Sequence, residues 1–175
     1  MDLGDTTWRA IEITREGWEV VENPDVHFIR DATTQALPEP VPGGSIEELR
    51  QFANCADEGS WIRLCGFLVM CFHPQGPYPV AYPTGEQGSA KSTLSRLICS
   101  LVDPRVAPLS MGGQSIRDLA VLANSVWLAA FDNVSKVSPA FADGLCQLST
   151  GGGYRTRKLY SDGETSSSTS GALFC

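Results

Sequence analysis

A short loop with two glycines and a lysine, residues 85–93, carries the clearest chemistry in this sequence. Its residues are Gly85, Glu86, Gln87, Gly88, Ser89, Ala90, Lys91, Ser92 and Thr93. Backbone N–H groups curl round an anion only where the chain turns tightly, and glycine provides that freedom. In such a loop Lys91 reaches the β- and γ-phosphates of a nucleotide, and Ser92 offers its hydroxyl to Mg²⁺. Glycine-rich turns before helices often bind nothing, but the sequence of strand, loop, Lys-Ser-Thr and helix favours a site for ATP with Mg²⁺.

The residue before the lysine departs from the common form of this motif. Glycine usually stands there, whereas this chain has Ala90. A positive φ costs more for alanine than for glycine. The loop is therefore expected either to pass through Ala90 at negative φ or to carry strain.

Alternating strands and helices are expected to position the loop. The apolar stretch Tyr78 to Tyr82 leads into it, and the amphipathic stretch Leu94 to Val102 leads out of it. A short strand, a helix and a buried strand follow, at Val106 to Leu109, Gln114 to Asn124 and Val126 to Phe131. This alternation predicts an α/β fold with a P-loop nucleotide-binding core.

An acid and an amide follow the last of these strands. Asp132 suits the magnesium shell of a bound nucleotide, although a capping aspartate after a buried strand is a common alternative. Many ATPases have a carboxylate at the next position to activate water, but Asn133 is an amide and accepts no proton at neutral pH. Lys91, Asp132 and Asn133 are the candidate catalytic residues, and the hydrolytic base is either elsewhere or absent.

A basic and aromatic segment follows the helix expected over Phe141 to Leu148. After three glycines come Tyr154, Arg155, Arg157, Lys158 and Tyr160. Cations in such a segment meet phosphates, and aromatic rings stack on bases. The segment is a candidate contact for single-stranded DNA, and a solvated β-strand accounts for it equally well.

Three pieces precede the core. Three runs that alternate apolar and polar residues predict a β-meander over residues 1–36: Trp8 to Ile13, Trp18 to Val21 and Val26 to Arg30. Its tryptophans, Trp8 and Trp18, are expected to pack in a core, with capping of a sheet face or contact with a partner as the alternatives. Prolines and glycines make residues 37–44 an extended linker.

A helical segment, residues 45–76, is expected between the linker and the core. Ser45 and Glu48 form a capping box for a helix that runs through Phe52. A second, largely apolar helix is expected from Trp61 to Phe72.

The composition is that of a globular protein. Twenty acidic and 13 basic residues give a formal net charge of −7, which argues against a surface that grips nucleic acid everywhere. The N-terminus has no signal-peptide pattern, and no apolar run reaches the roughly 18 residues of a membrane span. A cytoplasmic protein without membrane contact is expected. The six cysteines show no metal-ligand spacing, which favours free or buried thiols over a zinc site.

Three segments together resemble a known family. Residues 85–93, 131–135 and 145–160 look like bacterial and phage ATPases labelled primase- or helicase-associated, which are similar to superfamily 3 helicases of mobile elements. The resemblance implies a Walker A motif at residues 85–93, a Walker B motif at Asp132 and a DNA-contacting hairpin after residue 150. It also implies a homo-oligomeric ring, ATP hydrolysis coupled to movement on DNA, and Ala90 as a family variant.

The chain departs from this family after Tyr160. Such ATPases continue into a strand with a polar sensor residue, which lies between the Walker A and Walker B strands, and then into helices that supply an arginine to the neighbouring subunit. Here the P-loop core, residues 77–162, gives way to a serine-rich tail, residues 163–175, expected to be disordered. We therefore expect a truncated core whose sheet lacks its middle strand, and nucleotide binding with little turnover.

Two other functions stay open on the sequence. A small P-loop kinase would need a lid and arginines around an acceptor, and arginines cluster only within residues 151–160. A regulatory module that binds ATP without hydrolysing it agrees with Asn133 and with the absence of the sensor strand.

Overall fold

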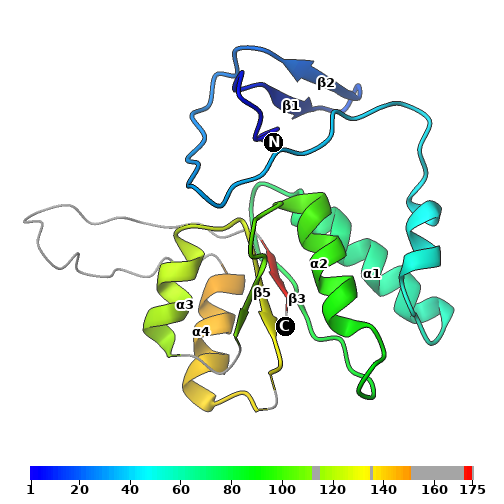
Figure 1. Cartoon of the computed structure of the whole chain (residues 1–175), viewed down its shortest axis with the longest axis vertical. Helices are drawn as coiled ribbons and strands as arrows, with labels where there is room; N and C mark the ends of the chain where they lie inside the picture. The colour runs from blue at the N-terminus through cyan, green and yellow to red at the C-terminus, as the bar shows by residue number, and fades with distance from the viewer. Residues whose placement is uncertain (112–114, 135, 151–171, 175) are drawn as a thin grey trace, which may run out of the picture.

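A computed structural model of the chain describes residues 1–111, 115–134, 136–150 and 172–174. Within these residues the fold is mixed α/β with two small sheets, one of two strands and one of four (Figure 1). The larger sheet carries the helices and the candidate site, and the smaller one lies in the N-terminal part.

The four-stranded sheet is parallel throughout. Its strands are β3 (Val80–Ala81), β4 (Leu109–Met111), β5 (Leu128–Asp132) and β6 (Ala172–Phe174), in the order β3-β6-β5-β4. Leu128 pairs with Ala172 on one side of β5, and Ala130 pairs with Leu109 on the other. The structure therefore confirms the prediction of a mixed α/β fold.

Strand β6 corrects an expectation about this sheet. The sequence predicted no middle strand, because residues 163–175 read as a serine-rich, disordered tail. Instead, Ala172–Phe174 form a strand between β3 and β5 and pair with both of them. The sheet therefore has a strand in the middle position, and the residues that form it were assigned to the tail.

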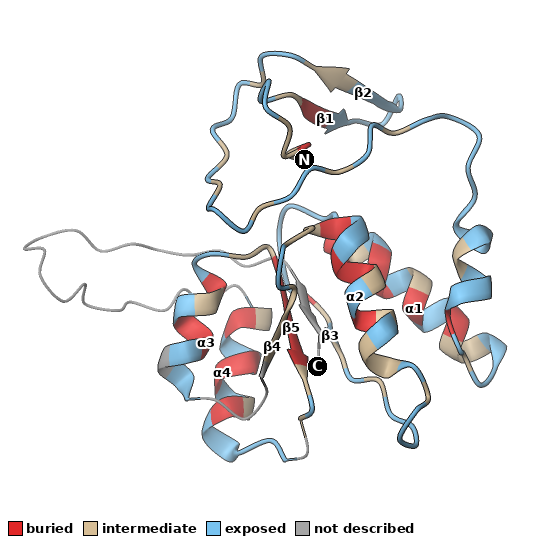
Figure 2. Ribbon diagram, viewed as in Figure 1, coloured by how far each residue is buried: buried red, intermediate tan, exposed pale blue. Residues whose placement is uncertain are grey.

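Strand β5 is buried on both faces. Leu128 and Ala130 belong to one core with helices α1 (Glu58–Cys71) and α2 (Lys91–Val102). Ala129 and Phe131 belong to a second core with α3 (Ile116–Ala123) and α4 (Pro139–Ser149). Since successive side chains of a strand point to opposite faces, β5 lies in the middle of a helix, sheet and helix arrangement (Figure 2).

Two cysteines contribute to the first of these cores. Cys71 ends α1 and Cys99 lies in α2, and both side chains are buried. Burial raises the pKa of each thiol to about 12, because the thiolate would lose its hydration. They serve as apolar packing groups at neutral pH.

Polar side chains set where most helices begin. The predicted capping box of Ser45 and Glu48 is present, and it starts a 3-10 helix, η1 (Ile46–Phe52). Asp57 accepts a hydrogen bond from the Ser60 N–H at 2.7 Å, so α1 begins at Glu58 and not at Trp61 as expected. Ser115 and Ser138 cap α3 and α4 in the same way.

The N-terminal sheet is a hairpin and not the predicted meander. Strands β1 (Ala10–Ile13) and β2 (Trp18–Val21) pair antiparallel, and residues 26–30 form no strand. Arg30 holds that segment through its side chain, since its guanidinium pairs with Asp2 at 2.5 Å and lies 3.9 Å from the ring centre of Trp8. Trp8 and Trp18 are about half exposed, so their predicted place in a core is wrong.

The segment after the hairpin is bonded to the chain after α2. The Gln35 N–H donates to the Pro104 carbonyl, and the Val106 N–H donates to the Thr33 carbonyl, both at 2.9 Å. Val106 is thereby drawn away from the larger sheet, which explains why β4 begins at Leu109 and not at Val106 as predicted.

Asp103 joins this region to β5. One of its oxygens, Oδ2, accepts hydrogen bonds from the backbone N–H groups of Trp127 and Leu128, at 2.7 and 3.2 Å. The other oxygen accepts from Arg105 Nε at 3.0 Å, and the Asp103 side chain is only 11% exposed. A mostly buried carboxylate therefore satisfies the N–H groups where β5 begins.

We predict that Asp103→Ala lowers the free energy of unfolding by about 3 kcal/mol, because two backbone donors and the Arg105 guanidinium lose their shared acceptor. Urea denaturation followed by circular dichroism measures the change. Asp143→Ala on the exposed side of α4 is the matched control and should change stability little. Equal stability of the two variants would contradict the role given to Asp103.

Candidate functional site

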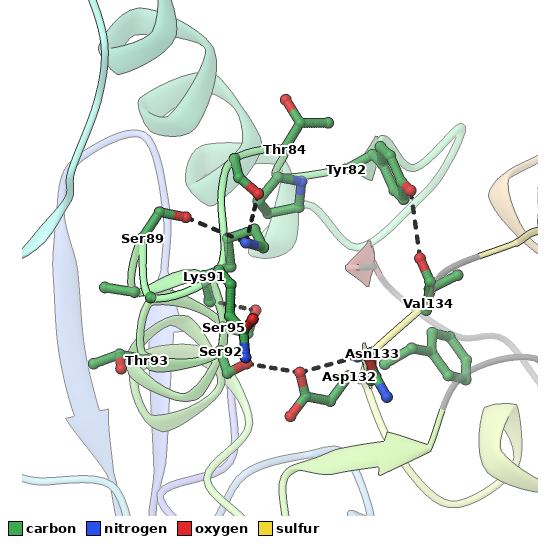
Figure 3. Close-up of a pocket in the computed structure, with 16 residues that line it drawn as sticks. Tyr82, Thr84, Ser89, Lys91, Ser92, Thr93, Ser95, Asp132, Asn133 and Val134 are labelled. Atoms are coloured by element: carbon green, nitrogen blue, oxygen red, sulfur yellow. Dashed lines mark hydrogen bonds between the residues drawn. The ribbon is translucent and has the colours of Figure 1, made fainter.

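A cavity of about 690 Å³ opens at the carboxyl edge of the parallel sheet. It is lined by the loop between β3 and α2 and by the residues where β5 ends, including Lys91, Ser92, Asp132 and Asn133 (Figure 3). Ligands of parallel α/β sheets commonly bind at this edge. The structure thus brings together the two segments that the sequence singled out separately.

The loop closes on itself through its glycines. A side chain at Gly85 would meet Ser89 Oγ at 2.7 Å, which is closer than real Cβ contacts come. Gly88 has φ +84°, a conformation that favours glycine. The Ser89 N–H then donates to the Glu86 carbonyl at 3.2 Å. The backbone conformation therefore favours glycine at position 88, and the closeness of the Ser89 side chain favours it at position 85.

Ala90 is strained where it enters the helix. Its φ is +64° and its ψ is +22°, in the left-handed region, and it is the N-cap residue of α2. Of the two alternatives that the sequence left open, the chain follows the strained one. Such strain, of about 1–2 kcal/mol for an L-residue, is often kept at functional sites because they need a particular backbone direction.

No side chain caps the N-terminus of α2, whereas Asp57, Ser115 and Ser138 cap the other three described α-helices. The first N–H groups of a helix have no partner within it, and the helix dipole adds partial positive charge there. The uncapped start of α2 therefore has both the donors and the potential to bind an anion.

Lys91 lies against the loop. Its Nζ donates to the carbonyl oxygens of Gly85 and Glu86, at 2.8 and 2.7 Å, and to Ser89 Oγ at 3.2 Å. The ammonium is thus held over the turn by three neutral acceptors. Glu86 takes part through its backbone, while Gln87 and Thr93 line the cavity with exposed side chains.

Ser92 and Asp132 meet across the cavity. Ser92 Oγ donates to Asp132 Oδ1 at 2.7 Å, and the same oxygen accepts from the Asn133 N–H at 3.0 Å (Figure 3). Asn133 has φ +59°, so the chain turns sharply as β5 ends. Across the part of the chain that the structure describes, no hydrogen bond to Asp132 Oδ2 is present, which leaves that oxygen available to a ligand.

Several lining residues were not found from the sequence. Tyr82, Thr84, Ser95 and Val134 all line the cavity. Tyr82 lies just after β3, and its hydroxyl is 3.5 Å from the Val134 carbonyl, so the two walls meet there. The sequence offered one sign of their role, namely that they lie close in sequence to the loop or to Asp132. The predicted DNA contacts Tyr154, Arg155, Arg157, Lys158 and Tyr160 lie outside the described residues.

The family to which the chain belongs agrees with a role on DNA. A family model described as actinomycete integrative conjugative element replication protein matches residues 45–171, well over half of the chain. The chain is therefore a replication protein of a mobile genetic element. It belongs to the family of actinomycete integrative conjugative element replication proteins and acts in the DNA replication of such an element.

This match corrects the earlier assignment by resemblance. Three segments resemble P-loop ATPases similar to superfamily 3 helicases, and a truncated member of that group was expected, but the matching family is a different one. The expected origin in mobile elements is confirmed. No curated protein and no solved structure matches the chain.

None of the helices in the described part of the chain combines the length and the apolar character needed to cross a bilayer.

The strain at Ala90 leads to a prediction about stability. Ala90→Gly should fold at least as stably as the natural protein, because glycine adopts φ +64° freely. Ala90→Val should be less stable than Ala90→Gly by about 2 kcal/mol, because a branched side chain is poorly tolerated there. Thermal unfolding of the two variants measures the difference. If valine is tolerated as well as glycine, the backbone at residue 90 is not left-handed.

Proposed function

We propose that this replication protein binds ATP with Mg²⁺ in the cavity between residues 85–93 and the end of β5, as a P-loop nucleotide-binding protein. The observation that carries the proposal is the meeting of Lys91, Ser92 and Asp132 at the uncapped start of α2. A cation, a hydroxyl, a carboxylate and free backbone N–H groups are the groups that a magnesium-bound triphosphate requires.

Lys91 fits a role in holding phosphate. Its present acceptors are two loop carbonyls and a hydroxyl, which are uncharged and easily exchanged. Phosphate oxygens are stronger acceptors for an ammonium group, so a triphosphate in the loop would replace them. Lys91 is also the only basic side chain among the residues that line the described cavity.

Ser92 and Asp132 fit a magnesium site. Mg²⁺ prefers oxygen ligands and is commonly held by one or two protein groups together with phosphates and water. A hydroxyl and a carboxylate 2.7 Å apart provide such a pair on the wall of the cavity. When bound, the metal would neutralise phosphate charge. Asp132 would hold its water shell, and Ser92 would contact it directly.

Asn133 favours binding over rapid hydrolysis. It follows Asp132 directly and lines the cavity, but its amide accepts no proton from water. Asn133 is the observation that favours the alternative function, in which ATP binding regulates the replication protein and no hydrolysis follows. In the other form of the proposal, hydrolysis drives movement on DNA, and the base that activates water comes from a residue elsewhere.

We predict that Lys91→Ala weakens Mg-ATP binding at least tenfold, because one charge-assisted contact to phosphate contributes about 1.5–3 kcal/mol. Isothermal titration calorimetry of the purified chain measures the change. Lys136→Ala removes the same charge from an exposed position outside the cavity and is the control.

Circular dichroism spectra of both variants should match that of the natural protein. Unchanged ATP affinity in Lys91→Ala would reject the proposed site.

We also propose that residues 154–160 contact single-stranded DNA, which suits a replication protein whose family match includes them. Replacing Arg155, Arg157 and Lys158 together by alanine should lower the slope of log affinity against log salt by about two, at about 0.7 per phosphate. Fluorescence anisotropy with a labelled oligonucleotide across a salt series measures the slope. A slope that does not change would move the DNA contact to another surface.

A further inference from the structure

A second, smaller cavity of about 240 Å³ adjoins the first one. The two share Pro83, Thr84, Gly85, Ser89, Ala90 and Lys91 as walls. The smaller cavity adds Asn54, Ala56 and Leu94, which come from the segment between η1 and α1 and from the first turn of α2. It is therefore a side chamber of the phosphate loop and not a separate site.

The residues that only the side chamber has are two apolar ones and one carboxamide, and its shared walls include both polar and apolar residues. Leu94 and Ala56 contribute hydrocarbon, and Pro83 adds its ring. Asn54 is exposed, and its carboxamide makes no hydrogen bond within the described part of the chain. A flat heterocycle with hydrogen-bonding edges matches such a chamber, since its faces need apolar contact and its edge needs a donor and an acceptor.

The position of Asn54 is fixed although its side chain is free. Ala53 before it is buried in the first core, and the Cys55 N–H donates to the Ala53 carbonyl at 2.9 Å. Two residues later Asp57 is tied to Ser60 as the cap of α1. A ligand would therefore meet a carboxamide on an ordered backbone, and only the side chain would lose freedom on binding.

Helix α2 links the two chambers. Leu94 follows Lys91 by three residues, so the two side chains lie on neighbouring positions of one face of the helix. A ligand with phosphates at Lys91 that extends into the side chamber meets Leu94 and Asn54 among its walls. The base of a nucleoside triphosphate has this relation to its phosphates.

We propose that the side chamber binds the base of the nucleotide and that Asn54 selects adenine. This inference rests on the proposed function of the phosphate loop. The Asn54 carboxamide would accept from the 6-amino group of adenine and donate to N7. Hypoxanthine presents two acceptors at this edge, its 6-oxo group and N7, and one carboxamide cannot donate to one and accept from the other. Leu94 and Pro83 would pack against the faces of the base.

The test compares three ligands in the presence of Mg²⁺: ATP, inosine triphosphate and inorganic tripolyphosphate. The natural protein should bind ATP about tenfold more tightly than inosine triphosphate. Asn54→Leu should lose that preference and keep its affinity for tripolyphosphate. Asn54→Asp, which has the same size but no donor, should also bind ATP more weakly. Asn23→Leu, at an exposed carboxamide in the N-terminal part, is the control.

The outcomes separate the two proposals. If the natural protein binds tripolyphosphate but does not distinguish ATP from inosine triphosphate, the base site is rejected and the phosphate site stands. The base site is also rejected if both Asn54 variants keep the full preference for ATP. If none of the three ligands binds, both proposals fail.

Discussion

Parallel strands end at one edge of their sheet, and this constraint creates the candidate site. Strand β3 leads into the loop that holds Lys91, and β5 ends at Asp132. Both ends face the same edge, which allows Ser92 Oγ to come within 2.7 Å of Asp132 Oδ1. Strand β5 is buried on both faces, and this fixes its register and therefore the position of Asp132 at the edge of the sheet. If β5 shifted by one residue against its neighbours, its apolar side chains would exchange between the two cores.

The cavity is a place of positive potential in a protein that is acidic overall. The chain carries a net charge of −7, yet the cavity contains Lys91, an uncapped helix start and a loop of backbone N–H groups. The first 44 residues lie outside the family match. They are nevertheless bonded to the chain that follows α2, through Thr33, Gln35 and Arg105. Asp103 in turn joins that chain to β5, so the N-terminal part and the sheet share one network of hydrogen bonds.

The sequence predicted the elements whose signal is local. The loop of residues 85–93, α2 and β5 were found because glycine, lysine and apolar patterns identify them within a few residues. The third N-terminal strand was wrong, because alternation at residues 26–30 does not reveal that Arg30 pairs with Asp2 through its side chain. Asn54 was missed, since nothing nearby in sequence suggests that it adjoins the loop at Gly85. Strand β6 was missed because it is only three residues long and forms by pairing with β3 and β5, which are far away in the sequence.

Strand β6 also determines when the site becomes complete during synthesis. Neighbouring strands lie about 4.8 Å apart, so β6 keeps β3 and β5 roughly 10 Å from each other. Within the described residues β3 has no other strand partner. A nascent chain that has left the ribosome as far as residue 134 already contains every residue that lines the larger cavity. It still lacks the spacer that sets their separation, so about forty more residues must leave the ribosome before the two walls reach their final distance.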